Sequence, residues 1–281
     1  MFDTHCHLNF KTFKKNYSEV IAAAKTSGVN YIVIPGTDLE TSVRAIEIAE
    51  QNAGIYAAVG IHPHHVFQIQ NSKLEVQNYK SELKNIEKLL TNPKIVAVGE
   101  VGLDRHVYKK TKYEDYQVDE AFIELQKELF IAQLKLAIKY KKSVIIHNRE
   151  AKKDLLSILT NNPSLITNTK IVFHCCEPDD ELLQFAKKHN VFIGVDGDVT
   201  YWKEKQKFIK KVPLELMVLE TDSPLLLPEP LRSQKLYPNE PKNIYLIAEF
   251  IAKLKNMTIG QLIEETANNS MKLFGLEENK G

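Results

Sequence analysis

The chain has 281 residues, and its charges nearly cancel, with 37 Lys and Arg against 36 Asp and Glu. This balance excludes a generally basic protein that coats nucleic acid, and no segment reaches the roughly 18 consecutive apolar residues that a membrane span needs. No secretory signal is visible, and the three cysteines, two of them adjacent, are a poor disulfide framework. We therefore expect a cytoplasmic protein without membrane association, and no obligate protein partner is evident.

Short apolar runs rich in Val and Ile alternate with longer amphipathic segments along the chain. The runs comprise residues 1–8, 31–34, 55–59, 95–101, 144–147, 171–174, 191–195 and 217–219. Most of them show little alternation of polar and apolar residues, which is typical of strands buried on both faces of a parallel sheet. The clearest helical pattern has apolar residues at spacings of three and four and joins Phe122, Leu125, Leu129, Ala132 and Leu136.

Eight strands that are each followed by a helix predict an α/β protein with a single-domain (β/α)8 TIM barrel. A doubly wound open sheet is the alternative that fits the same alternation. We expect the barrel to span residues 1–276, with a closing helix after residue 256 and a polar tail at residues 277–281. Two long irregular segments, 104–118 and 224–241, would both lie on the catalytic face of such a barrel.

Residue types that bind metals stand at the ends of several predicted strands. His5 and His7 are two apart, so on a strand their imidazoles point the same way, with Cys6 on the opposite face. The other strand-end candidates are Glu100, His147, His174, Glu220 and Asp222. In a barrel the carboxyl ends of the strands ring one mouth, where these side chains would converge. One such histidine is more often structural, but the whole set favours a site for two divalent ions.

Several segments of the chain resemble the TatD-like metal-dependent hydrolases, also called TatD-related deoxyribonucleases, which fold as amidohydrolase-like TIM barrels. The matching segments are FDTHCHL, VGIHPHH, AVGEVGLD, IIHNREA, VFHC, LETDSP, TANNSMKLFGL and, more weakly, LR…NEP. They are spread over residues 2–276 and therefore cover essentially the whole chain.

The resemblance implies a ligand set for each of two ions. One ion would be held by His5, His7, Glu100 and Asp222, and the other by Glu100, His147 and His174, so that Glu100 bridges them. His62 and Arg149 would bind substrate at the mouth, and Asp104 would support the site. Read without the resemblance, His62 belongs to a solvated cluster, Arg149 to a helix surface, and Asp104 is a capping or loop carboxylate.

The chain departs from the family pattern at two positions near the predicted mouth. Arg105 and His106 follow Asp104, where the family commonly has an aromatic residue. Residues 176–178 read Cys-Glu-Pro, where many members have Phe-Ser-Gly after the Phe-His-Cys motif. These departures concern substrate preference, because Glu177 would repel a phosphate group unless its side chain points away.

The leading hypothesis is a deoxyribonuclease that hydrolyses phosphodiester bonds. Two divalent ions, Zn, Mg or Mn, would generate hydroxide, with Asp222 accepting the proton, Glu100 bridging the ions, and Arg149 and His62 orienting the phosphate. The basic loop with Tyr108 and Tyr113, together with residues 201–202, could provide surfaces on which DNA bases stack, or could be ordinary loop and packing residues. The alternatives are hydrolysis of another ester or amide, such as aminoacyl-tRNA, and a non-catalytic binding barrel.

Overall fold

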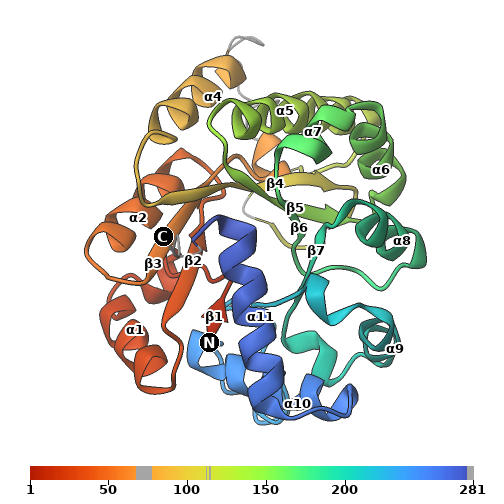
Figure 1. The fold of residues 1–281 in the computed structure, drawn as a ribbon. Helices are drawn as coiled ribbons and strands as arrows, with labels where there is room; N and C mark the ends of the chain where they lie inside the picture. The colour runs from red at the N-terminus through yellow and green to blue at the C-terminus, as the bar shows by residue number, and fades with distance from the viewer. Residues whose placement is uncertain (68–77, 112, 114, 277–281) are drawn as a thin grey trace, which may run out of the picture.

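Eight parallel strands form the centre of the molecule. The computed structural model describes residues 1–67, 78–111, 113 and 115–276. The strands follow one another around a single sheet in chain order, so the TIM barrel is confirmed and the doubly wound sheet is excluded (Figure 1). They are β1 (Phe2–Asp3), β2 (Tyr31–Pro35), β3 (Ile55–Val59), β4 (Ile95–Asp104), β5 (Ser143–Arg149), β6 (Ile171–Phe173), β7 (Phe192–Val195) and β8 (Met217–Leu219).

Helices surround the strands on the outside of the barrel (Figure 1). The α-helices are α1 (Tyr17–Thr26), α2 (Leu39–Glu50), α4 (Asn78–Leu89), α5 (Glu120–Lys139), α6 (Lys152–Asn161), α7 (Pro163–Asn168), α8 (Asp180–His189), α9 (Lys203–Lys211), α10 (Ile244–Leu254) and α11 (Ile259–Phe274). Short 3-10 helices are η1 (Lys11–Phe13), η2 (Pro63–His65), η3 (Gly197–Thr200), η4 (Leu214–Leu216) and η5 (Pro241–Asn243). Among the described helices, none combines the length and the apolar character needed to cross a membrane.

The ends of the helices follow from local hydrogen bonding. Helix α5 begins after Asp119, whose carboxylate accepts a hydrogen bond from the Phe122 amide. The predicted apolar face is buried in part, since Leu125 and Ala132 are only half-buried. Helix α11 begins at a capping box between Thr258 and Gln261. It ends at Gly275, whose φ of 65° lies in the left-handed region that glycine adopts without strain.

The first and last strands close the barrel through a few hydrogen bonds rather than through a long ladder. The Thr4 amide donates to the Leu219 carbonyl at 3.0 Å, and the Asp222 amide donates to the His5 carbonyl at 2.9 Å. The Cys6–Ser223 pair forms an isolated parallel bridge. The prediction of a strand over residues 1–8 is therefore wrong in length, because regular pairing ends at Asp3 and the next residues contact the end of β8 only at single points.

Helix α11 closes the barrel at the amino ends of the strands. Leu273 and Phe274 pack against the lower barrel interior, which includes Phe2 and Val33. The side-chain amide of Asn269 donates to the carbonyls of Leu214 and Met217 at 2.8 and 2.9 Å, and so ties α11 to the start of β8. Figure 1 shows α11 lying across the barrel beside β1. The predicted tail, residues 277–281, lies outside the described residues.

The close approach of β4 and β5 depends on Gly102, which pairs with His147 in the sheet register. Its φ is 151°, and a Cβ atom at this position would overlap the main-chain carbonyl of His147. We expect Gly102→Ala to lower the free energy of unfolding by about 3 kcal/mol, because the backbone must move and the new conformation is strained. Urea denaturation followed by circular dichroism measures the change.

The matched control is Gly260→Ala in α11, where a Cβ atom meets nothing within 4 Å. We expect Gly260→Ala to be neutral or to stabilise the protein by about 0.5–1 kcal/mol, since alanine is the better helix former. Equal stability of the two variants would show that β4 and β5 are not packed as closely as the structure has them.

Candidate metal centre

One buried carboxylate, Glu100 on β4, lies at the centre of the carboxyl-terminal mouth of the barrel. Its side chain is only 5% exposed. Its Oε1 atom lies 2.9 Å from His147 Nδ1, 3.4 Å from His62 Nε2 and 3.8 Å from His174 Nε2. These imidazoles come from the ends of β5, β3 and β6, so three strands deliver a ring to one oxygen atom.

The other oxygen of Glu100 faces the two histidines near the start of the chain. Oε2 lies 3.4 Å from His5 Nε2 and 3.7 Å from His7 Nε2, and these two nitrogens are 3.1 Å apart. Asp222 approaches from the end of β8, with Oδ1 3.7 Å from His5 Nε2, 3.5 Å from His7 Nε2 and 3.9 Å from His174 Nε2. The two imidazoles thus point the same way, as their spacing predicts, although they follow β1 instead of lying in it.

The structure brings all six predicted metal ligands together. Their possible ligand atoms fall into three groups in which all atoms lie within 4.8 Å of one another: His5 with His7 and Asp222, His5 with Glu100 and His174, and His62 with Glu100 and His147. His62, expected to bind substrate, therefore lies within reach of the same carboxylate as the ligands. The division of ligands between two ions stays a prediction.

Burial and neighbouring charges set the protonation of these groups. Burial raises the pKa of Glu100, but His62, His174 and the hydrogen bond from His147 outweigh it and hold the pKa well below its usual value. Burial, aided by the charge of His174, lowers the pKa of His5 to about 4. His5 is thus neutral at physiological pH and keeps a lone pair with which to bind a metal.

Two other imidazoles are shifted in the opposite direction. Burial lowers the pKa of His147, but hydrogen bonds to Asp104 and Glu100 outweigh it and raise the pKa to about 9. For His174 the burial effect is outweighed chiefly by Glu220 and Glu100, which raise the pKa to about 10. Without a metal, protons on these two rings balance the buried carboxylates.

The residues present fit divalent cations. Every ion-pair partner of Glu100 and Asp222 in the described ranges is an imidazole, so no lysine or arginine there neutralises these carboxylates. The Nδ1 atoms of His5 and His7 are buried and have no hydrogen-bond partner among the described residues. A set of imidazole and carboxylate donors suits zinc or manganese, and carboxylates also accept magnesium.

Further carboxylates contact two of the imidazoles at the ring nitrogen that faces away from Glu100. Asp104, at the end of β4, lies with Oδ2 3.1 Å from His147 Nε2. Glu220 lies with Oε1 3.2 Å from His174 Nδ1 and is fully buried. Such contacts fix the orientation of a histidine ring and increase its basicity. Asp104 was expected to support the site, whereas the sequence marks Glu220 only as a strand-end candidate, without a specific role.

Asp3 is a buried residue near the centre that sequence reasoning missed. Its carboxylate accepts hydrogen bonds from the Thr221 amide at 3.0 Å and the Thr221 hydroxyl at 2.6 Å, and so links the segments that carry His5 and Asp222. Burial raises the pKa of Asp3 to about 8, although the bonds from Thr221 oppose the shift. The signal in the sequence is the polar pair Asp-Thr, which interrupts the first apolar run.

The predicted substrate residue Arg149 lies at the end of β5. Its Nη1 atom donates to the Tyr108 hydroxyl at 3.1 Å, and its guanidinium lies 5.0 Å from the centre of the Tyr108 ring. Glu177, expected to repel phosphate, accepts hydrogen bonds from the Glu150 amide at 3.3 Å and the Asn148 side chain at 3.4 Å.

The basic loop differs in part from the surface that its composition predicts. Arg105 is engaged by two carboxylates, with Nη1 2.9 Å from Glu120 and Nε 2.7 Å from Asp154, so it is not free to follow a nucleic acid backbone. Lys109 and Lys110 are exposed, and Lys112 lies outside the described residues. Stacking of bases on Tyr201 and Trp202 stays a prediction, although the Trp202 side chain is exposed and Tyr201 lies beneath the guanidinium of Arg232 at 4.1 Å.

A buried ion cluster beside β7 was also missed. Lys205 has no exposed surface, and its ammonium lies 3.1 Å from Asp196 and 3.1 Å from Asp198. In the sequence these residues look like a polar loop followed by a solvated helix. The cluster fixes η3 beside the mouth, because Asp196 caps that 3-10 helix through the Asp198 amide.

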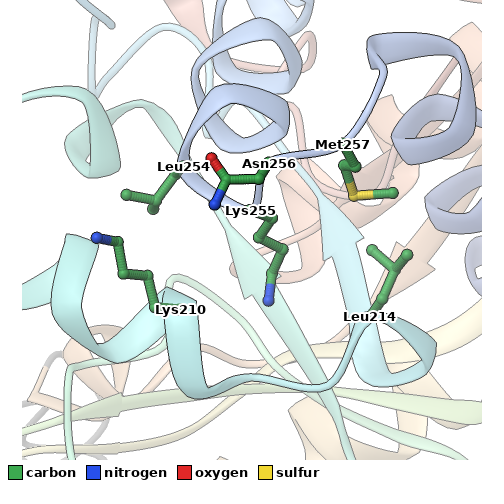
Figure 2. Close-up of a pocket in the computed structure, with 6 residues that line it drawn as sticks. All are labelled: Lys210, Leu214, Leu254, Lys255, Asn256 and Met257. Atoms are coloured by element: carbon green, nitrogen blue, oxygen red, sulfur yellow. The ribbon is translucent and has the colours of Figure 1, made fainter.

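One pocket lies away from the metal centre. Figure 2 shows it at the carboxyl ends of α9 and α10, where the chain leads into the start of β8, so it is at the opposite end of the barrel. Its lining consists of Lys210, Leu214, Leu254, Lys255, Asn256 and Met257. The ammonium of Lys255 already donates to the Val212 carbonyl at 2.7 Å. This pocket holds none of the predicted ligands.

Comparisons with known proteins agree with the geometry. The model of the TatD related DNase family matches residues 2–275. An uncharacterized metal-dependent hydrolase of Bacillus subtilis (strain 168), YabD, is 34% identical over 276 residues, or 98% of each chain. The 3'-5' ssDNA/RNA exonuclease TatD of Escherichia coli (strain K12) is 30% identical over 280 residues, or 98% of this chain and 99% of its own. The crystal structure of the TatD homolog YjjV from Escherichia coli K12 superposes with a TM-score of 0.82 at 27% identity, covering 99% of this chain and 98% of that one.

Removing the charge of Glu100 tests its place at the centre. We expect Glu100→Gln to weaken binding of Zn²⁺ or Mn²⁺ by at least about 100-fold. Losing a residue that only orients a metal ligand lowers metal affinity about 10–100-fold, and losing a ligand itself should lower it more. Calorimetric titration of the metal-free protein measures the affinity. The exposed Glu215→Gln is the control and should bind metal as the wild type does. Equal affinity of wild type and Glu100→Gln would contradict a metal centre at this carboxylate.

The Asp198 carboxyl provides a test by pH. Burial, together with the charge of Asp196, raises the pKa of Asp198 above its ordinary value of 3.8. A carboxyl with a raised pKa contributes most stability below the unfolded pKa and loses it as pH rises. We therefore expect Asp198→Asn to gain stability relative to wild type between about pH 5 and about pH 8, by on the order of 1–3 kcal/mol.

Urea unfolding of both proteins across this range measures the difference. The exposed, non-titrating substitution Gln234→Ala should keep a constant difference from wild type. A pH-independent difference for Asp198→Asn would mean that this carboxyl is ionised in the folded protein.

Proposed function

The chain belongs to the TatD-related DNase family, and from that premise we propose that it is a deoxyribonuclease whose site holds two divalent metal ions. The observation that carries the proposal is Glu100, which presents one carboxylate oxygen to His5 and His7 and the other to His147. A carboxylate that faces ligands on both sides is suited to join two ions. The named activity of the Escherichia coli relative, a 3'-5' ssDNA/RNA exonuclease, supports single-stranded nucleic acid as the substrate.

The proposed ligands are His5, His7, Glu100 and Asp222 for one ion, and Glu100, His147 and His174 for the other. Bound divalent ions would supply Lewis acidity to water and neutralise charge on the phosphate oxygens. The protein's contribution is to keep His5 neutral and to orient His147 and His174 through Asp104 and Glu220.

Asp222 is the proposed acceptor of the proton that the attacking water gives up. Its side chain is nearly buried at the mouth, and its main chain is fixed by the bond from its amide to the His5 carbonyl at 2.9 Å. The residue has φ of 50°, an unfavourable conformation for a non-glycine residue that the surrounding contacts must maintain. A carboxylate held in one position can accept the proton without reorienting during the reaction.

Arg149 and His62 are proposed to orient the phosphate group. Arg149 forms no ion pair with a carboxylate in the described ranges, so its charge is available to a ligand. A guanidinium can hold two phosphate oxygens at once, which fixes the phosphate in the plane of the side chain. The neighbouring imidazole of His62 borders the same mouth, 3.4 Å from Glu100.

Asp222→Asn tests the function. With Mn²⁺ or Mg²⁺ present, we expect the wild type to shorten fluorescently labelled single-stranded DNA. The variant should lose about 10²–10⁴-fold in kcat, the range attributed to general base catalysis. A gel-based time course with single- and double-stranded DNA measures the rates, and circular dichroism shows that the variant is folded.

Asp180→Asn, an exposed carboxylate on α8, is the control and should keep full activity. Undiminished DNA cleavage by Asp222→Asn would refute its role as the base. If the wild type deacylates charged tRNA and leaves DNA intact, the enzyme acts on a carboxylic ester and the nuclease proposal fails.

A further inference from the structure

Tyr108 joins the predicted phosphate-binding arginine to the metal centre. Its hydroxyl donates to Asp104 Oδ2 at 2.8 Å and accepts from Arg149 Nη1 at 3.1 Å. The guanidinium of Arg149 lies over the Tyr108 ring, 5.0 Å from its centre. One side chain therefore fixes both an edge and a face of the guanidinium.

The contacts continue inward from Tyr108. Asp104 lies 3.1 Å from His147 Nε2, and His147 Nδ1 lies 2.9 Å from Glu100 Oε1. The sheet register places Asp104 opposite Arg149 on the neighbouring strands β4 and β5. An unbroken series of polar contacts therefore runs from the buried carboxylate at the centre to an arginine at the mouth.

The Tyr108 hydroxyl lies between the opposite charges of Asp104 and Arg149. Asp104 is a buried carboxylate directly beside Arg149, and a direct ion pair between them would neutralise the charge that a phosphate needs. The Tyr108 hydroxyl accepts the guanidinium hydrogen and gives its own hydrogen to Asp104, so it stands between the two charges. Within the described ranges, Arg149 makes no ion pair with Asp104 or another carboxylate.

Neighbouring rings hold Tyr108 in this orientation. The His64 ring stacks on it with centroids 5.1 Å apart and an interplanar angle of 28°. His106 and Tyr116 contact it edge-on, at 4.8 and 6.1 Å. Burial and the charge of Asp104 raise the pKa of the Tyr108 phenol, so the hydroxyl keeps its hydrogen at physiological pH.

We propose that Tyr108 is a positioning residue that holds Arg149 apart from Asp104 and presents the guanidinium to the phosphate of the substrate. This inference rests on the proposed function for the identity of the substrate, and on the contacts above for the role of Tyr108. A long arginine side chain loses rotamer freedom when it is fixed. Tyr108 fixes it before the ligand arrives, which leaves less entropy to be lost on binding.

The first test uses dTMP, a mononucleotide that contains no phosphodiester bond, so that binding is measured without turnover. We expect Tyr108→Phe in the metal-loaded protein to weaken dTMP binding about tenfold, because a hydrogen bond to a charged group is lost and Arg149 can then pair with Asp104. Tyr108→Phe keeps the ring and therefore the stacking of His64. Isothermal titration calorimetry measures the affinity.

Tyr116→Phe is the matched control, because Tyr116 belongs to the same group of rings and its buried hydroxyl has no hydrogen-bond partner among the described residues. It should bind dTMP as the wild type does. In an Arg149→Met background, Tyr108→Phe should produce no further loss, since the group that it positions is gone.

The combined outcomes show whether Tyr108 positions Arg149 or only packs against its neighbouring rings. The inference is overturned if the losses of affinity in Tyr108→Phe and Arg149→Met are independent and multiply in the double variant. It is also overturned if Tyr108→Phe binds dTMP with unchanged affinity, or if the wild type does not bind dTMP. A kinetic readout accompanies binding: Tyr108→Phe should raise KM for single-stranded DNA more than it lowers kcat. If the expected dTMP coupling is found but the wild type cleaves no nucleic acid, the proposed function fails while the role of Tyr108 stands.

Discussion

The structure depends on a single buried carboxylate with five imidazoles around it. Burying the charge of Glu100 is costly unless opposite charge or hydrogen bonds compensate it. Histidines that follow β1, β3 and β6, together with His147 within β5, provide that compensation, at distances of 2.9–3.8 Å. Because these five rings come from four different parts of the barrel, the balance of charge exists only when the barrel is closed.

Carboxylates farther from the centre turn this cluster into a site of fixed geometry. Asp104 and Glu220 hold the outer nitrogens of His147 and His174, and Asp3 joins the segments that carry His5 and Asp222. On the β5 side the same network passes through Tyr108 to the arginine at the mouth. The site therefore has a charged interior of alternating acids and imidazoles, with the guanidinium of Arg149 held against Tyr108 at the mouth.

Local pattern was sufficient to predict the barrel and the convergence of its strand ends. Uninterrupted apolar runs mark buried parallel strands, and the run at 217–219 coincides with β8. The predicted length of the first strand was wrong because the sequence cannot show that residues 4–7 bond singly to the last residue of β8, to β2 and to residues 222–223 instead of forming a regular ladder. The sequence analysis also did not predict the pairing of Arg105 with Glu120 and Asp154 or the burial of Lys205. Each feature depends on how a loop folds back onto a helix or a neighbouring loop. Tyr108 appeared in the sequence as a loop aromatic, because its contacts with Asp104 and Arg149 depend on the register that places those two residues side by side on β4 and β5.

The way the barrel is sealed has a consequence for biosynthesis. His5 and His7 leave the ribosome long before residues 220–223, which contact the same segment of the chain and belong to the last part of the barrel to be made. Contacts between such distant segments form late, because the intervening chain must first be ordered. A nascent chain of this protein therefore carries no assembled cluster of these imidazoles and carboxylates during most of its translation.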